Sequence, residues 1–498
     1  MMLSKKHKNN SKSESQETVR KIEEELPYFV AIITLMAASG ISPFISLKKI
    51  ILLDLLPTMS IEAKRMVKQI EILGVDPLSV MNKRAAKTLS KQYKDFLGGY
   101  VSTVQAGGNV VHFLRAKMDS IFDLRDSIAK EVVAKLAALV DAYMIIQVVV
   151  LTMYIVFVVL SATPSLAASM LSDPNDAKNL SYMFLALPPL LSGMLMFISH
   201  RMTSSTYIGM ERILKKHLLF AVIAIPVSVV LSLAIPSQYV SLPYFLAAAQ
   251  LGSLFIPYRE YAKIEKMNTV AERVTPNILR NIAESRKTGL SPERCVLHTF
   301  KSREYGIFSN VLNHAANQLQ WGISLKTMID HIKKHVNSWF VLINFRMLVE
   351  VIESGGGDVG ALDTLATSSD KIYNVEKVKK SMLQPYVMIA VMITAITGFT
   401  TLLVIDSFTG LSQNISVGGQ TQLASTDTQN MRQMFAASIV FQAHLVGLFI
   451  GKIVSGTFAT GLKYSIMLTV VVLLSIAVVD FAPIDIGMIF LPPETSDT

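Results

Sequence analysis

The stretch Gly107-Gly108-Asn109-Val110 reappears as Gly356-Gly357-Asp358-Val359, 249 residues further along the chain. The same offset pairs Ile41-Ser42-Pro43 with Leu290-Ser291-Pro292. It also lays the apolar runs near 142–161 and 218–235 onto those near 391–405 and 467–484. Chance similarity rarely keeps one register across polar motifs and apolar blocks together. The chain therefore contains a duplicated structural unit.

Bulk composition predicts a membrane protein with basic soluble regions. Apolar residues make up 51% of the chain, which also carries 47 Lys and Arg against 37 Asp and Glu. Seven mostly apolar segments approach the ~20 residues that a helix needs to cross a bilayer. They are 142–161, 182–199, 218–235, 241–257, 386–405, 434–451 and 464–481. Segment 241–257 is the weakest, because it is short and contains Pro243.

The distribution of basic residues predicts the orientation. Of the 47 Lys and Arg residues, 21 precede the first span and 18 lie between the fourth and fifth spans. Cytoplasmic loops carry such an excess of positive charge. We therefore expect the N-terminus inside, seven crossings and the C-terminus outside. Four spans separate the two soluble regions, which places both regions in the cytoplasm.

The predicted fold is all-α, because the soluble regions show helical spacing and no strand-like alternation. Each soluble region is expected to be a bundle of about six short helices. Glycines and a capping aspartate predict tight turns between these helices at Gly40, Gly107, Gly108, Gly289, Gly356, Gly357 and Asp358. The expected organisation is a disordered basic tail (1–20), a cytoplasmic helical domain (21–140), four spans (141–257), a second cytoplasmic helical domain (258–385), three spans (386–482) and an extracellular tail (483–498).

These landmarks resemble the type II secretion F domain, which occurs twice in the platform proteins of type IV pilus-like machines. The matching stretches are 26–27 with 38–42, 275–276 with 287–291, 105–110 and 353–362. Seven spans are more similar to the archaeal branch, the FlaJ-type archaellum platform and its adhesive-pilus counterparts. One departure is that the family's acidic residue before the glycine turn is Glu353 in the second repeat but Gln105 in the first.

The resemblance implies a non-enzymatic platform in the cell membrane. Such a platform is expected to dock a hexameric secretion ATPase, to act on pilin- or archaellin-like subunits, to contact membrane lipids and to form a homodimer. No nucleic acid partner and no cofactor is implied. The rival hypothesis is a secondary transporter, since transporters also use repeated membrane halves.

No motif predicts catalysis or a metal site. Residues 355–360 fit G-x-G-x-x-G, but they follow a predicted helix, whereas a dinucleotide site needs a preceding strand. His331 and His335 share a helix face but have no clear third ligand for zinc. Cys295 is the only cysteine, so no disulfide forms within the chain.

Two sets of residues are candidates for binding. The first is a basic stripe at helical spacing, with two lysines in the second repeat: Lys83, Arg84, Lys87, Lys91, Lys94, Lys333 and Lys334. It would attract an acidic partner such as the ATPase or anionic lipids, or it is a solvated face. The second set is Gln442 and His444 in the sixth span. Polar groups at membrane depth are costly, so we expect hydrogen bonds between helices, a subunit contact or ion passage.

Overall fold

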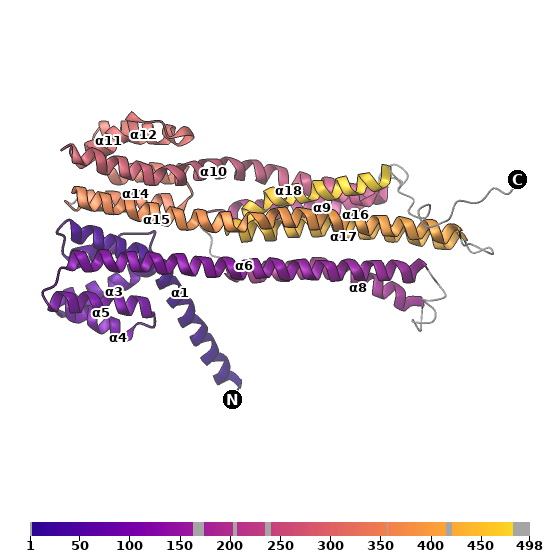
Figure 1. Ribbon diagram of the computed structural model, residues 1–498, viewed down its shortest axis with the longest axis horizontal. Coiled ribbons are helices and arrows are strands. Elements are labelled where there is room, and N and C mark those ends of the chain that lie inside the picture. The colour runs from indigo at the N-terminus through magenta and orange to yellow at the C-terminus, as the bar shows by residue number, and fades with distance from the viewer. Residues whose placement is uncertain are drawn as a thin grey trace. The chain divides into compact units, whose positions relative to one another are not determined.

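The computed structural model describes residues 2–162, 174–202, 207–234, 241–355, 357–414 and 421–481. These residues form helices and contain no extended strand, which confirms the all-α fold class (Figure 1). The chain divides into two compact units. Unit 1 combines residues 1–130 with 264–378, and unit 2 combines residues 131–263 with 379–498. Each unit therefore contains segments from both repeats.

The first repeat supplies six helices to unit 1. They are α1 (Met2–Ala38), α2 (Pro43–Ile51), α3 (Pro57–Leu73), α4 (Pro77–Lys87), α5 (Lys91–Gln105) and the first part of α6 (Val110–Ala162). Three of them begin with proline, which suits the first helical turn because no backbone donor is lost there. Asp76 and Ser90 cap α4 and α5, each accepting a bond from a backbone N–H of the first turn.

The second repeat supplies an equivalent set to unit 1. It comprises the later part of α10 (Leu242–Lys287), then α11 (Pro292–Ser302), the 3-10 turn η1 (Gly306–Phe308), α12 (Ser309–Gln320), α13 (Leu325–His335), α14 (Trp339–Glu353) and most of α15 (Val359–Leu383). The described residues of each repeat thus form the six α-helices expected of a bundle.

The two repeats share one hydrophobic core in unit 1. Phe29 meets Phe96 edge-on in the first repeat, with ring centroids 6.0 Å apart, and Phe300 meets Phe345 in the same way in the second. Both pairs belong to the same continuous cluster of buried residues. The repeats therefore bury apolar surface in one shared cluster.

Unit 2 contains α8 (Pro174–Met202), α9 (Glu211–Ala234), α16 (Pro385–Asn414), α17 (Thr421–Ser455) and α18 (Phe458–Phe481), with the remainder of α6 and α10. Five stretches of the described residues are long and apolar enough to span a membrane, and they correspond to the first, third, fifth, sixth and seventh predicted spans. Predicted spans 182–199 and 241–257 lie on α8 and α10 and are not among the five, so the total of seven stays a prediction. The chain is a polytopic membrane protein.

Helix α17 lies at the centre of unit 2. Of the most apolar stretch of α17, 78% is buried inside the protein, against 17% for the corresponding stretch of α9. Close contact with α18 depends on glycine, because a Cβ on Gly451 would lie 2.1 Å from the Cα of Gly461. Small residues allow helix backbones to approach in this way inside membranes.

Three predicted boundaries and one predicted tail differ from the structure. The unit boundaries fall inside α6, α10 and α15. Helices α6 and α10 join the bundle to apolar sequence without a break, whereas α15 ends at Leu383, directly before α16. Helix α1 begins at Met2, across the tail expected to be disordered. Once the buried part of α1 has formed, each further residue added to the helix gains one hydrogen bond. Extension of α1 toward the N-terminus is therefore favoured. The predicted tail 483–498 lies outside the described residues.

Candidate functional site

Helices α5 and α14 are equivalent elements with different surroundings. Each has 15 residues, and 248 residues separate both their starts and their ends. Five residues of α5 are buried, against twelve of α14. Helix α14 therefore belongs to the centre of unit 1, whereas α4 and α5 lie at one margin and α11 and α12 at the other (Figure 1).

The first repeat covers α14 through polar as well as apolar contacts. Trp339 Nε1 donates to the carbonyl oxygen of Leu55 (3.1 Å), and its ring stands edge-on against Tyr28 with centroids 4.4 Å apart. One Nη of Arg346 donates to the carbonyl oxygen of Leu52 (3.4 Å). These contacts join α14 to α1 and to the segment between α2 and α3.

The contact between the repeats is one-sided. In the described part of the chain, no hydrogen bond or ion pair joins α4 or α5 to α10, α11 or α12. A two-fold arrangement would repeat the contacts of α14 at α5. The polar contacts of α14 are therefore not repeated at α5, and the corresponding face of the first repeat is left uncovered.

Four of the predicted basic residues lie on that uncovered side: Lys83, Lys87, Lys91 and Lys94. We call these four residues the lysine face. All are exposed, and none pairs with a carboxylate among the residues that the structure describes. Leu89, in the turn between α4 and α5, has 73% of its surface exposed. This turn also corrects the predicted stripe, since α4 ends at Lys87 and α5 begins at Lys91.

Arg84 does not belong to the lysine face, although the sequence placed it there. Its Nη2 donates to Glu62 Oε1 (2.7 Å) and its Nε to Glu62 Oε2. Arg65 bonds the same carboxylate at 2.7 Å. Glu62 is buried, and a buried carboxylate is tolerated only when it is paired and hydrogen-bonded. Arg84 therefore holds α4 against α3.

The predicted lysines of the second repeat have separate surroundings. Lys333 pairs with Asp54 of the first repeat at 2.9 Å, and this hydrogen bond lowers the pKa of the Asp54 carboxyl despite partial burial. Lys334 is exposed. Burial lowers the pKa of nearby His331, and the neighbours His335, His314 and Lys334 add to this effect. Lys333 is thus part of the contact between the repeats, whereas Lys334 is exposed.

The glycine turns form where the sequence predicts them, with one shift of register. Gly40, Gly107 and Gly289 have positive φ, but Gly108 does not. In the second repeat the positive-φ residues are Gly355 and Gly357, while Gly356 lies outside the described residues. Helices α5 and α14 are 248 residues apart but α6 and α15 are 249 apart, so the second turn is one residue longer.

The longer turn is held by both repeats. A Cβ on Gly357 would lie 2.9 Å from Pro292 Cγ, which excludes larger residues. Arg286 Nε donates to the carbonyl oxygen of Gly357 (2.8 Å). Asp358 accepts from the backbone N–H of Gly360 (3.0 Å) and from Ser39 Oγ of the first repeat (3.3 Å). Asp358 thus caps α15 and joins the repeats.

The acidic residue that differs between the repeats also has a structural partner. Glu353 pairs with Lys326 of α13 at 2.9 Å, and this bond raises the pKa of the lysine. At the offset of 248, the first repeat has Gln105 and Leu78 instead. The carboxylate therefore fastens α14 to α13, and the first repeat has lost both members of the pair.

The two polar residues of α17 face different neighbours in unit 2. His444 Nε2 lies 3.2 Å from His217 Nε2 of α9, and Ser465 Oγ donates to the carbonyl oxygen of His444 (2.8 Å). Gln442 lines a small cavity together with Tyr143, Gln147, Thr394, Thr397 and three apolar residues. Gln147 and Gln442 are both buried.

His217 and Gln147 were not among the residues predicted from the sequence. Gln147 lies inside the first predicted span, so the rule that singled out Gln442 would have found it. His217 lies just before the third predicted span, and no local pattern pairs it with a residue 227 positions away. Within the described ranges, no group of three or more His, Cys, Asp or Glu is placed to hold a metal ion.

Comparison with known protein families identifies both repeats. The model of type II secretion system (T2SS) protein F matches residues 29–158 and again residues 278–405. The chain belongs to this family. The two matches begin 249 residues apart, and together they cover more than half of the chain. Searches of curated proteins and of solved structures gave no match. Membership of the protein F family indicates a membrane platform protein of secretion- and pilus-type systems.

Proposed function

We propose that this protein is the membrane platform for assembly of an archaellum or type IV pilus-like filament. It docks a cytoplasmic hexameric secretion ATPase and passes the motion of that ATPase to pilin- or archaellin-like subunits in the membrane. Both soluble regions and the N-terminus face the cytoplasm, and the C-terminus faces outward. The positive-inside distribution of Lys and Arg supports this orientation.

The observation that carries the proposal is the way in which the units are joined. Both copies of the protein F domain contribute to one core in unit 1. From this unit, α6 and α10 cross the unit boundary as uninterrupted helices, and α15 ends at Leu383, directly before α16. A force applied to unit 1 would reach unit 2 along helices rather than along loops, and rigid elements of this kind transmit coupling between distant sites.

Interrupting one of these helices tests the coupling. We would insert four glycines after Lys130, inside α6. Each glycine destabilises a helix by roughly 1 kcal/mol relative to alanine, so the insertion should interrupt α6. The matched control carries the same insertion after Gly322, in the turn between α12 and α13. We expect the α6 variant to retain the ATPase in pull-downs from native membranes but to assemble no filaments. The control should assemble filaments.

Two results would contradict the proposal. One is wild-type protein that brings down no secretion ATPase from its own cells. The other is normal filament assembly by cells from which the gene has been deleted. Uptake of a solute by proteoliposomes of the purified protein would instead favour the transporter hypothesis.

A further inference from the structure

The lysine face is the counterpart of a surface that is already occupied in the second repeat. At the offset of 248, Lys91 corresponds to Trp339 and Lys94 to Leu342. Trp339 binds the first repeat through Tyr28 and Leu55, and Leu342 is buried. The same helix face thus binds a neighbouring module in one repeat and faces outward in the other.

We infer that the lysine face binds an acidic protein surface, and that each chain offers this site once. This inference rests on the proposed function, because the partner to which it commits is the docked ATPase. It goes beyond that function by placing docking on the first repeat alone. The second repeat has no such site, because α14 is covered from within the chain.

The positive charge of α4 and α5 favours an acidic partner. Four exposed lysines lie on two consecutive helices, and Asp95 is the only exposed acidic residue within the two helices. Neighbouring like charges repel one another, and a partner that brings carboxylates relieves the repulsion and is steered toward the site. The exposed Leu89, between Lys87 and Lys91, offers apolar area that a protein surface can bury.

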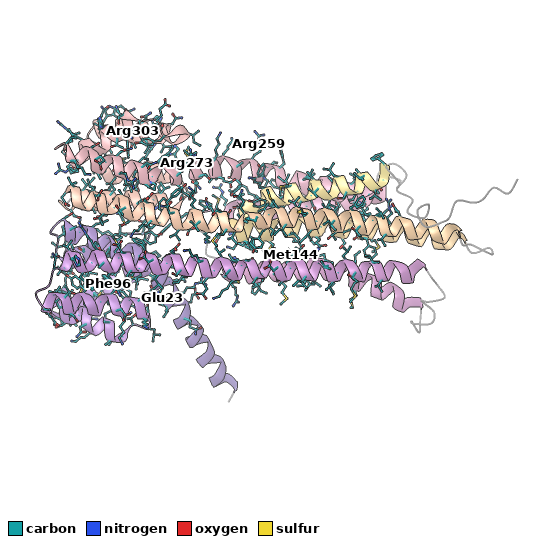
Figure 2. The ribbon with its side chains drawn as sticks, in the orientation of Figure 1. Glu23, Phe96, Met144, Arg259, Arg273 and Arg303 are labelled. Carbon is teal, nitrogen blue, oxygen red and sulfur yellow. The ribbon has the colours of Figure 1, made fainter. Side chains whose placement is uncertain are left out.

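A second copy of the chain that repeated the contact of α14 would not fit this face. Such a contact would bring the second repeat's counterpart of the segment Leu52–Leu55 onto the lysines. At the offset of 249 that relates α2 to α11, Leu52 corresponds to Lys301 and Asp54 to Arg303. Arg303 is exposed on α11's side of unit 1 (Figure 2). Lysines would then meet cations, and such a juxtaposition opposes association.

The test compares two charge reversals of equal size in the full-length protein. The first variant carries Lys87→Glu, Lys91→Glu and Lys94→Glu. The control carries Arg294→Glu, Lys301→Glu and Arg303→Glu, which are exposed residues of the second repeat. The probe is the purified hexameric secretion ATPase encoded in the same genome, added to detergent-solubilised protein at 150 mM salt. Equal apparent melting temperatures of the two variants would show that both are folded.

We expect the first variant to bind the ATPase about ten-fold more weakly, and the control to stay within about two-fold of wild type. A third variant, Leu89→Ser, should weaken binding by a smaller factor without any change of charge. High salt should reduce wild-type binding toward the level of the first variant, since surface charges are screened.

Three outcomes would overturn the inference while leaving the platform function intact. The control could lose the ATPase while the first variant keeps it, which would place docking on the second repeat. The first variant could lose only binding to vesicles with 30% anionic lipid, which would make the face a lipid contact. It could instead lose only a dimer seen by light scattering, which would make the occupant a second copy. A wild-type protein that binds no ATPase would contradict the proposed function itself.

Discussion

Helices α5 and α14 begin and end at equivalent positions of a duplicated module, yet one is amphipathic and the other is buried almost all round. The membrane helices show a similar difference, since 39% of the apolar stretch of α18 is buried, against 17% for its counterpart α9 in the first half. In both units the second copy supplies the more enclosed helix of the pair. The two copies thus keep the same helices. The neighbours of each helix within its unit differ, however, so its faces carry different residue types.

Exchange of side chains at one equivalent position should give the largest effect. Leu342→Lys places a charge in α14 with no partner, and an uncompensated buried charge costs about 3–5 kcal/mol. The reverse change in α5, Lys94→Leu, lies on an exposed face and should alter the free energy of unfolding by less than about 0.5 kcal/mol. The measurement is the apparent melting temperature of the purified full-length protein in detergent. Equal losses at both positions would refute the difference in burial.

An added methyl group should distinguish the packed helices of the second half from the open helices of the first. Gly451→Ala would force the backbones of α17 and α18 apart, and overpacking of this kind costs typically about 1–3 kcal/mol. Gly193 of α8 has no heavy atom within 4 Å of an added Cβ. Gly193→Ala is therefore the control, and it should be neutral or stabilising. Thermal unfolding of both variants provides the check, and an unaffected Gly451→Ala protein would show that the helices are not in close contact.

The ion pair between the repeats should have the smallest effect, and one that depends on pH. Both side chains are well exposed, with 47% of Lys333 and 66% of Asp54 accessible, so screening limits the pair to about 0.2–1 kcal/mol. The pKa of Asp54 is lower in the folded protein than in the unfolded chain. Its contribution is therefore present above the ordinary value of about 3.9 and is lost as the pH falls through the folded value.

The variant Asp54→Asn isolates this contribution. The wild-type protein should be slightly more stable than the variant at neutral pH, and the difference should disappear in the acid range and at high salt. Denaturant unfolding of both proteins across that pH range measures it. A stability gap that persists well below pH 4, by the ordinary carboxyl value of about 3.9, would show that the interaction is not ionic.

Much of the fold could be predicted from the sequence because the signals are local. Gly40 and Gly289 end helices at the expected turns, since only glycine adopts positive φ there at little cost. Five of the seven predicted spans coincide with apolar helices of the structure. The family was also recognisable from short motifs, because two copies at a constant spacing carry more information than one.

The candidate binding residues were predictable only in part, because charge type does not reveal the partner. Arg84 and Lys87 look alike in the sequence, yet the first is engaged by the buried Glu62 and the second is exposed. Lys333 pairs with a residue 279 positions away, and His217 lies beside His444 across 227 positions. No periodicity within a single helix encodes such pairs.

The helices, the apolar spans and the turns can be read from the amino-acid sequence, because each depends on residues close together in the chain, and the duplication is visible when the chain is compared with itself. The enclosure of α14 and the exposure of the lysine face become apparent only in the folded protein. Burial and charge pairing depend on the side chains that a neighbouring element presents. Two copies of one module therefore acquire different surfaces once they share a core.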